Sequence, residues 1–379
     1  SNKTDCKAST IHSFLKQSDN ANPQNKPHPD ILILDETSMI DSKMMSRLLD
    51  CIPNKTRLVA MGDANQLPSI GAGAILRDMS NSWIPCSHLD EVRRQQDDSK
   101  IIKLATHIRE GVEPDKLSNN NEYQMMASQT DNDIKSNIKN KIKTLLSENN
   151  TGDSIQVLVP TNVGKLGTNQ LNRELRPFLH PDYKQHDRAN ILIGGKNKPG
   201  SKGGGNDVYV GDRVLQSKND YDSGLHNGMR GTVVAVDHSK GTLKVAFMDT
   251  HMEYDAGKAE ELQLDYVSTI HRSQGSQYPN VIIAMGGDGS KPSQSVDRNS
   301  LYTGITRAEQ SVTLIGHPNQ FKQVITQNPS ENRHTALPYE LVNHMPQQTH
   351  QAETQSDVTT TIDEADSNDQ DSHNTVEMG

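Results

Sequence analysis

Short apolar runs along the chain alternate with segments in which apolar residues recur at helical spacing. The clearest run is Ile31–Leu34, four consecutive aliphatic residues that lead directly into Asp35 and Glu36. Such a run, bounded by Pro29 and polar residues, predicts a strand that is buried on both faces of a parallel sheet. Open α/β sheets bind ligands at the carboxyl ends of their strands, so the two acids mark a candidate site. A strand that ends in a solvated loop with two surface acids explains this segment equally well.

The same patterns predict strand–helix alternation through most of the chain. Asp41 or Ser42 is expected to cap a helix that runs to about Cys51, and its buried side is predicted to consist of Met44, Met45, Leu48 and Leu49. Further strands are predicted at 57–61, from His88, and at 155–160, 280–285 and 311–315. Further helices are predicted from Ser9 or Thr10 onward, at 99–111 and 134–147, within 161–179, and at 300–308. Residues 16–30, with three prolines, are predicted to form a loop, and residues 112–133 carry no clear signal.

One region interrupts this alternation. The segments 208–217, 231–238, 242–249 and 251–255 have the short period of half-buried strands and are separated by Gly and Asn. Regularly spaced short strands of this kind predict a small antiparallel, barrel-like module.

Composition changes the picture mainly at the C-terminal end. Hydrophobic residues make up 32% of the 379 residues and aromatic residues only 4%, so part of the chain is not expected to pack. From about Met345 the sequence is rich in Gln, Thr, Asp and Ser, and we predict that it is disordered because it cannot offset the entropy of ordering. This tail holds eight acidic residues and no Lys or Arg, which leaves 40 of the 48 acids beside all 39 basic residues. The net charge of −9 therefore does not argue against nucleic-acid binding by the rest of the chain.

The three cysteines, Cys6, Cys51 and Cys86, share no spacing typical of a metal or redox site. The chain has neither a secretory signal nor a long apolar run. These features predict a cytoplasmic protein without a membrane segment.

Two strand ends carry residues suited to phosphate chemistry. One carboxylate of the Asp35–Glu36 pair could hold Mg²⁺ through water, and the other could orient or deprotonate an attacking water. The strand at 57–61 runs into a loop, Gly62-Asp-Ala-Asn-Gln-Leu-Pro, in which Gln66 could bond a phosphate oxygen or a water. An ordinary surface loop remains the alternative for this second segment.

Several blocks, taken in order, resemble one family. Five blocks resemble motifs II to VI of superfamily 1 DNA helicases. In chain order they are Asp35-Glu-Thr-Ser-Met, Gly62-Asp-Ala-Asn-Gln-Leu-Pro-Ser, Glu91-Val-Arg-Arg-Gln, Thr269-Ile-His-Arg-Ser-Gln-Gly-Ser and Tyr302-Thr-Gly-Ile-Thr-Arg-Ala. They are most similar to the RecD-like branch, which moves 5′→3′. Each block alone is a weak signal, but all of them in order are a strong one, and the resemblance covers about residues 5–342.

The resemblance implies an α/β fold with two RecA-like P-loop NTPase motor domains, an inserted SH3-like β-barrel, and ATP and Mg²⁺ as cofactors. Asp35 would hold Mg²⁺, Glu36 would activate water, Gln66 would sense the γ-phosphate, and Arg94 and Arg307 would be arginine fingers. The expected domains are 1–86 (first motor domain, truncated), 87–190 and 263–345 (second motor domain), 191–262 (barrel) and 346–379 (acidic tail).

The resemblance also implies contacts to nucleotide and to single-stranded DNA or its junctions with duplex. Gly62, Asp63, Gly275 and Gln277 match positions near the nucleotide. The positions that match the single-strand path are Thr10, His12, Asn219, Thr269, His271 and Ser273. Contacts of this kind go mostly to phosphates and carry little sequence preference. The spacing alone favours a histidine on a helix surface for His12 over a DNA contact.

Four departures from the family pattern limit this interpretation. Arg93 replaces an aromatic residue, and Gln277 replaces the usual Glu, which puts a ribose contact in doubt. Residues 16–30 are short for a duplex-splitting hairpin. The chain also lacks any Gly-x-x-x-x-Gly-Lys-Ser/Thr loop, which would cradle the β- and γ-phosphates.

We therefore expect the larger C-terminal part of an ATP-dependent 5′→3′ DNA helicase, inactive by itself. One alternative is an ATPase-inactive nucleic-acid-binding module, and another is the helicase part of a conjugative relaxase–helicase. A recombination or repair complex is suggested by analogy only.

Overall fold

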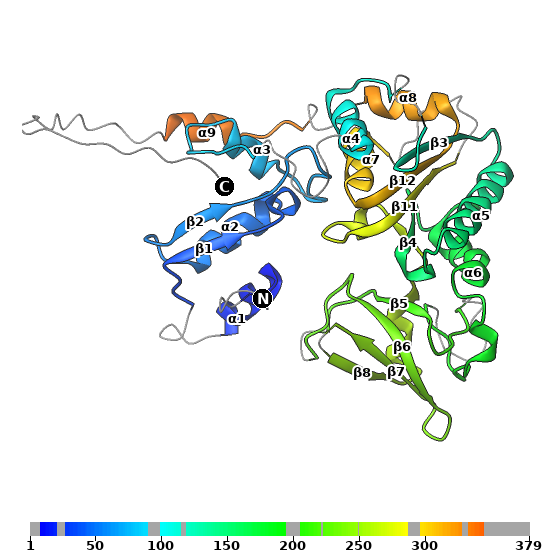
Figure 1. The fold of residues 1–379 in the computed structure, drawn as a ribbon. Coiled ribbons are helices and arrows are strands. Elements are labelled where there is room, and N and C mark those ends of the chain that lie inside the picture. Colours follow the sequence, from blue (N-terminus) through cyan, green and yellow to red (C-terminus); the bar gives the residue numbers. More distant parts are fainter. Residues whose placement is uncertain are drawn as a thin grey trace, which may run out of the picture.

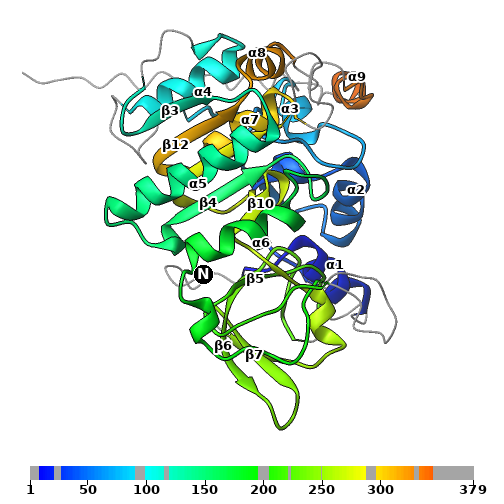
Figure 2. The ribbon, with the colours of Figure 1, turned by 90° about the vertical axis from the view of Figure 1, so that its right-hand side faces the viewer.

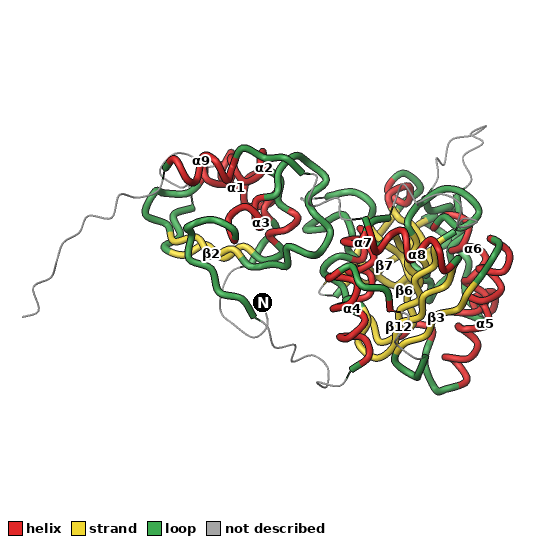
Figure 3. Tube along the Cα trace, turned by 90° about the horizontal axis from the view of Figure 1, so that it is seen from above, coloured by secondary structure: helices red, strands yellow, loops and turns green. Residues whose placement is uncertain are grey.

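The computed structural model describes residues 8–20, 27–89, 99–114, 119–194, 205–220, 223–248, 250–286, 296–327 and 333–344. The predicted strand after His88, the Glu91-Val-Arg-Arg-Gln block with Arg93 and Arg94, and the acidic tail fall outside these ranges. The described part forms two lobes, and an antiparallel sheet extends the larger lobe (Figure 1 and Figure 3).

The smaller lobe is built on a two-stranded parallel sheet. Strands β1 (Ile31–Leu34) and β2 (Arg57–Ala60) pair in register. Helices α1 (Ile11–Asn20), α2 (Ser42–Cys51) and α3 (Ile75–Ser80) belong to the same lobe. Asp41 caps α2 by accepting from the Met44 amide at 2.7 Å, as the sequence predicted. The core of the lobe consists of Leu15, Leu34, Ile40, Met45, Leu48 and Ile75.

The prediction that the first strand is buried on both faces was wrong for this structure. Ile31 and Ile33 are 55% and 59% exposed, and only Leu34 is fully buried. Successive side chains of a strand point to opposite faces, and the described residues cover only one face of this small sheet. Leu49, which was predicted to be buried in α2, is exposed for a similar reason, since it lies on the solvent side of that helix.

The larger lobe holds a five-stranded parallel sheet in the order β10-β4-β11-β12-β3. Its strands are β3 (Tyr123–Ala127), β4 (Ile155–Val159), β10 (Val267–Thr269), β11 (Tyr278–Met285) and β12 (Ala308–Gly316). Helices α5 (Asp131–Ser147) and α6 (Thr168–Leu179) cover one face; α4 (Lys100–Glu110), α7 (Arg298–Ile305) and α8 (Pro318–Thr326) cover the other (Figure 2).

Burial of this sheet on both faces explains its nearly continuous apolar strands. Val157 and Ile282 pack toward α5 and α6. Leu158 and Ile283, one residue further along the same strands, pack toward α4 and α7.

The antiparallel module lies beside this lobe, as predicted. Its sheet has the order β8-β7-β6-β5-β9. The strands are β5 (Arg213–Gln216), β6 (Arg230–Asp237), β7 (Thr242–Phe247), β8 (Thr250–Tyr254) and β9 (Leu262–Leu264). Val214, Val245 and Leu264 share one hydrophobic core with the α5–α6 face of the parallel sheet. The module is therefore packed onto the larger lobe over a common core.

Two assignments from sequence need correction. The helix that begins after Thr10 continues to Asn20, although residues 16–20 were predicted to be loop; Ser18 in its last turn is buried, and the helix packs against α2. Strand β3 lies in the segment that carried no clear signal. Its alternation is weak because it is an edge strand that pairs only with β12. No helix among the described residues is long and apolar enough to cross a membrane.

After α8 the described chain reappears on the smaller lobe as a strap, residues 333–343, which ends in α9 (Leu337–Asn343) next to α3 (Figure 1). Arg333 fastens the strap. Its guanidinium donates to the carbonyls of Ser69 at 2.6 Å, Gly71 at 3.2 Å and Gly73 at 2.9 Å. The Nε1 of Trp83, the single tryptophan of the chain, donates to the Leu341 carbonyl at 2.7 Å.

We expect Arg333→Ala to destabilise the smaller lobe by about 2 kcal/mol, because three backbone carbonyls lose their donors. Urea unfolding followed by Trp83 fluorescence measures this directly, since the chain has one tryptophan. Arg333→Lys should fall in between, because an ammonium lacks the planar fork. Arg188→Ala, which removes an exposed ion pair to Asp207, is the matched control and should change little. An Arg333→Ala midpoint equal to that of Arg188→Ala would contradict the role of the strap.

Candidate functional site

The carboxyl ends of β1 and β2 lie side by side and present the predicted acids. The Met61 amide donates to the Leu34 carbonyl at 2.8 Å, and the Thr37 amide donates to the Met61 carbonyl at 2.9 Å. Asp35 is exposed at this edge, and its Oδ1 accepts from the Glu36 amide at 2.8 Å. Glu36 has the left-handed conformation, with φ of 51°. This conformation is uncommon for a residue with a side chain and is often found at functional sites.

Gly62 allows the two strand ends to come this close. A Cβ at position 62 would lie 3.0 Å from Leu76 Cδ2 and 3.1 Å from the Thr37 amide nitrogen. The close approach of backbone to backbone therefore favours glycine here. As a result, the loop that begins at Gly62 and Asp63 starts directly beside the Asp35–Glu36 turn.

Gln66 and Arg307, predicted to act on the same phosphate, are in contact. Arg307 Nη2 donates to Gln66 Oε1 at 3.1 Å, although the two residues come from different lobes and are 241 positions apart. Arg307 is only 3% exposed, and its Nε donates to the Thr303 carbonyl at 3.1 Å. The guanidinium is thus held at the boundary between the lobes, where it faces the loop that follows β2.

The sequence did not single out the other side chains of α7 that reach this loop. Tyr302 OH donates to Asp63 Oδ2 at 2.8 Å, and Thr303 Oγ1 accepts from the Leu67 amide at 2.8 Å. Asn299 Nδ2 donates to the carbonyls of Asn65 at 2.8 Å and Gln66 at 3.2 Å. The available signal was polar residues at positions 299 and 303, one helical turn apart on the same face of the helix.

Burial raises the pKa of Tyr302, and the negative charge of Asp63 raises it further. The hydroxyl therefore stays protonated at physiological pH and remains a donor to the Asp63 carboxylate.

Leu67 joins the lobes through apolar packing. It is 2% exposed and belongs to the hydrophobic core of the larger lobe, with Ile270 and Ile305. Gln274 Nε2 also donates to the Leu67 carbonyl at 3.4 Å. The loop of residues 63–67 is therefore built into the larger lobe although it follows a strand of the smaller one.

Five of the predicted positions lie between Thr269, the last residue of β10, and Gln277, around a short turn at His271–Ser273. Thr269 Oγ1 accepts from the Arg272 amide at 3.3 Å, and Ser273 Oγ donates to the Ile270 carbonyl at 2.7 Å. Thr269 is 6% exposed and Ser273 is fully buried, so both hydroxyls are used inside the turn. His271, Gly275 and Gln277 are exposed, and Gly275 has a φ of 75°. In this conformation His271 is the predicted DNA contact of this segment that faces solvent.

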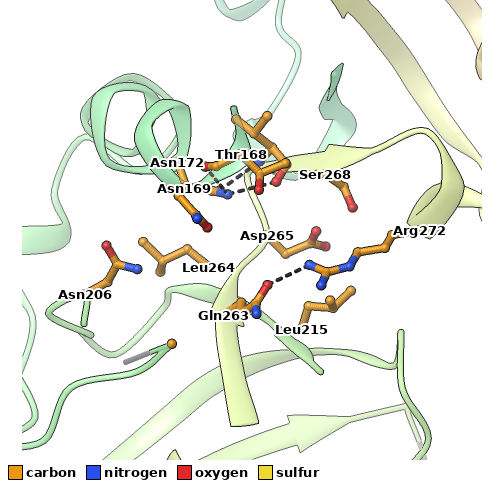
Figure 4. A pocket seen from close by; sticks show the side chains of 12 residues that line it. Thr168, Asn169, Asn172, Asn206, Leu215, Gln263, Leu264, Asp265, Ser268 and Arg272 are labelled. Carbon is orange, nitrogen blue, oxygen red and sulfur yellow. Dashed lines mark hydrogen bonds between the residues drawn. The ribbon is translucent and has the colours of Figure 1, made fainter. Parts of the chain in front are cut away.

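A small polar pocket between α6 and the β9–β10 connection anchors this turn (Figure 4). Asn172 donates to the Thr168 and Val267 carbonyls at 2.9 and 2.8 Å, and accepts from the Val267 amide at 2.9 Å. Arg272 Nη1 donates to Gln263 Oε1 at 2.6 Å. These contacts fix both ends of β10, and with it the position of His271.

The buried Asp265 adds charge to this pocket. It forms an ion pair of 2.9 Å with Arg230. Burial raises the pKa of Asp265, whereas the charges of Arg230, Arg213 and Arg272 act in the opposite direction.

The remaining predicted DNA contacts lie apart from this turn. Thr10 Oγ1 accepts from the Ser13 amide at 3.2 Å and so caps α1, and His12, two residues later, is exposed. Asn219, exposed in the antiparallel module, accepts from the Asn227 amide at 2.8 Å. Arg94 lies outside the described residues.

The residues at the β1 edge fit a hydrated Mg²⁺ held mainly by a ligand's phosphates. Mg²⁺ commonly uses only one or two protein carboxylates and keeps several waters, and Asp35 provides one exposed carboxylate here. Within the described ranges, no three His, Cys, Asp or Glu side chains gather into a metal cage.

Comparison with known proteins places these residues in context. Residues 1–131 match the AAA domain family, and residues 265–315 match the UvrD-like helicase C-terminal domain family. The ATP-dependent RecD2 DNA helicase of Deinococcus radiodurans is 29% identical over 336 residues, covering 87% of this chain and 42% of the relative. The RecBCD enzyme subunit RecD of Haemophilus influenzae is 27% identical over 390 residues, covering 85% of this chain and 57% of the relative.

Among solved structures, a Bacteroides Pif1 helicase in complex with ADP-AlF3 and single-stranded DNA aligns with a TM-score of 0.43 and 18% identity, over 87% of this chain and 77% of that one.

These matches show that the chain is a homologue of the RecD-like superfamily 1 helicases. It spans about half the length of the two relatives described above.

Proposed function

We propose that this chain carries the hydrolysis and DNA-contacting parts of an ATP-dependent motor that moves 5′→3′ on single-stranded DNA. The observation that carries the proposal is the Gln66–Arg307 contact, at 3.1 Å across the two lobes. A glutamine and an arginine from opposite lobes can both respond to one γ-phosphate, and such a response changes how the lobes meet. The homology to RecD-like helicases supports the same assignment.

In this proposal each residue has one task. Mg²⁺ would neutralise charge on the phosphates, and Asp35 would hold it through water. Glu36, fixed in a left-handed conformation beside Asp35, would orient and deprotonate the attacking water. Arg307 now donates to the Thr303 carbonyl and to Gln66. It would give up the contact to Gln66 and contact the phosphate instead. Arg94 would be a second arginine at the same phosphate.

The finer description of the fold belongs to the same proposal. The two lobes would be RecA-like domains with boundaries near residues 86 and 190, and the antiparallel sheet would be an SH3-like domain inserted at 191–262. Its core, shared with α5 and α6, supports an insertion that moves with the larger lobe.

Single-stranded DNA and its junctions with duplex are the proposed partners. The exposed His271, His12 and Asn219 would line the strand path, while Thr269 and Ser273 would shape the turn that presents His271. A role in recombination or repair would follow from the RecD relatives, one of which is a subunit of the RecBCD enzyme.

The hydrolysis assignment predicts the behaviour of two forms of the protein. The printed sequence has no phosphate-binding loop, so we expect the chain alone to show little ATPase activity, with or without single-stranded DNA. Joining the corresponding segment of a RecD-like relative ahead of residue 8 should give DNA-stimulated hydrolysis, measured by phosphate release.

In that joined protein, Glu36→Gln should lower kcat by at least about 100-fold while ATP binding is kept, because the amide cannot take a proton. Asp50→Asn, which changes an acid at the end of α2, is the matched control. Full activity of Glu36→Gln would overturn the assignment.

The DNA assignment predicts how His271 contributes. Partial removal of water from the imidazole lowers the pKa of His271 below 6.5, although much of the residue faces solvent. At pH 7.5 the ring is therefore neutral and can contact a phosphate only by a hydrogen bond. His271→Gln should weaken binding of a fluorescent oligo-dT without changing the slope of log affinity against log salt. A slope reduced by about 0.7, the value for one lost cation on a single strand, would show that His271 binds DNA as a charged group.

A further inference from the structure

Helix α7 contacts the loop of residues 63–67 at three separate points, and none of these contacts involves the side chain of Gln66. We propose that Asn299, Tyr302 and Thr303 form an interlobe latch, a set of positioning residues that holds this loop on α7 so that Gln66 and Arg307 face each other before nucleotide binds. The proposal rests on the function proposed above, because it assigns a purpose to the placement of Gln66.

Asn299 fixes the backbone around Gln66. Its Nδ2 donates to the carbonyls of Asn65 and Gln66, at 2.8 and 3.2 Å, which lie on either side of the Gln66 residue. Asn299 is only 5% exposed. One amide group therefore holds two consecutive peptide groups, which limits rotation of the backbone that carries the Gln66 side chain.

Thr303 and Tyr302 hold the two ends of the loop. Thr303 is fully buried and accepts from the amide of Leu67, whose side chain is itself in the core of the larger lobe. Tyr302 donates to Asp63, and Asp63 Oδ1 accepts from the Asn65 amide at 2.9 Å. The loop is therefore fastened at its first and last residues and in the middle.

The spacing of the latch residues follows from the helix. Positions 299, 302 and 303 lie at i, i+3 and i+4 and share one face of α7, and Arg307 follows four residues after Thr303. This face holds the loop, and Arg307, two residues beyond the end of α7 at Ile305, donates to Gln66. Different side chains hold the loop and contact the phosphate. Arg307 and the Gln66 side chain can turn to a phosphate while Asn299, Tyr302 and Thr303 keep the lobes joined.

Amide exchange in the full 379-residue chain, without nucleotide, tests the latch itself. Thr303→Val keeps the shape of the side chain but leaves the Leu67 amide without its acceptor, whereas Thr303→Ser restores a hydroxyl. We expect the Leu67 amide to exchange at least about tenfold faster in Thr303→Val and at nearly the wild-type rate in Thr303→Ser. Asn299→Ala should likewise accelerate exchange across residues 65–67.

The controls separate a local effect from unfolding. Tyr254→Phe removes another buried hydroxyl, which donates to Gln216 in the antiparallel module, and should leave residues 65–67 unchanged. Amides of β11 and β12 should stay protected in every variant. Unchanged exchange at Leu67 in Thr303→Val, with the central strands intact, overturns the latch.

Kinetics in the joined protein test whether the latch positions Gln66. Thr303→Val and Asn299→Ala should each lower kcat about tenfold with KM changed less than twofold, because the lost alignment matters most in the transition state. Thr303→Ser should recover kcat. Faster Leu67 exchange with an unchanged kcat overturns the positioning role. Absence of ATPase activity in the wild-type joined protein counts against the proposed function, while the exchange experiment still decides whether the latch exists.

Discussion

The insertion of Leu67 into the core of the larger lobe is the contact on which the arrangement of this protein depends. A two-stranded parallel sheet with exposed outer side chains has little rigidity of its own, since isolated strand pairs are marginally stable. The smaller lobe nevertheless presents Asp35, Glu36 and Gln66 in a defined place. It can do so because the loop after β2 is anchored at Leu67 by apolar packing and at its backbone by polar side chains of α7.

The strap of residues 333–343 holds the same segment of the smaller lobe at a second place. Arg333 bonds carbonyls of residues 69–73, immediately after the anchored loop. The segment from residue 62 to residue 73 is thus held from the larger lobe at its beginning and by the returning chain at its end.

The antiparallel module is tied to the larger lobe by a different kind of contact. Its strands share a continuous hydrophobic core with α5 and α6, and the β9–β10 connection leads from it directly into the turn that presents His271. Asn172 and Arg272 hold that connection through hydrogen bonds. A DNA strand that touched the module and His271 would therefore meet one rigid surface.

The sequence by itself determined the local elements and the chemical character of the site. Short, nearly continuous apolar runs identified the central strands β4, β11 and β12, the cap at Asp41 identified the start of α2, and the order of motif-like blocks indicated a RecD-like helicase. These features depend on residues close together in the chain. The sequence did not predict the edge strand β3 or the last turn of α1, because β3 pairs with the distant strand β12 and α1 packs against α2.

Only the tertiary structure decided which side chains are exposed and which distant segments contact one another. That Ile31 and Ile33 are exposed depends on how many elements cover a sheet, which no local pattern records. That Thr269 and Ser273 use their hydroxyls inside a turn, and that Asn299, Tyr302 and Thr303 hold a loop more than 230 residues away, follows from contacts between segments far apart in sequence. Spacing along the chain reports which side chains share a helix face, but the partner of that face is set by the packing of the lobes.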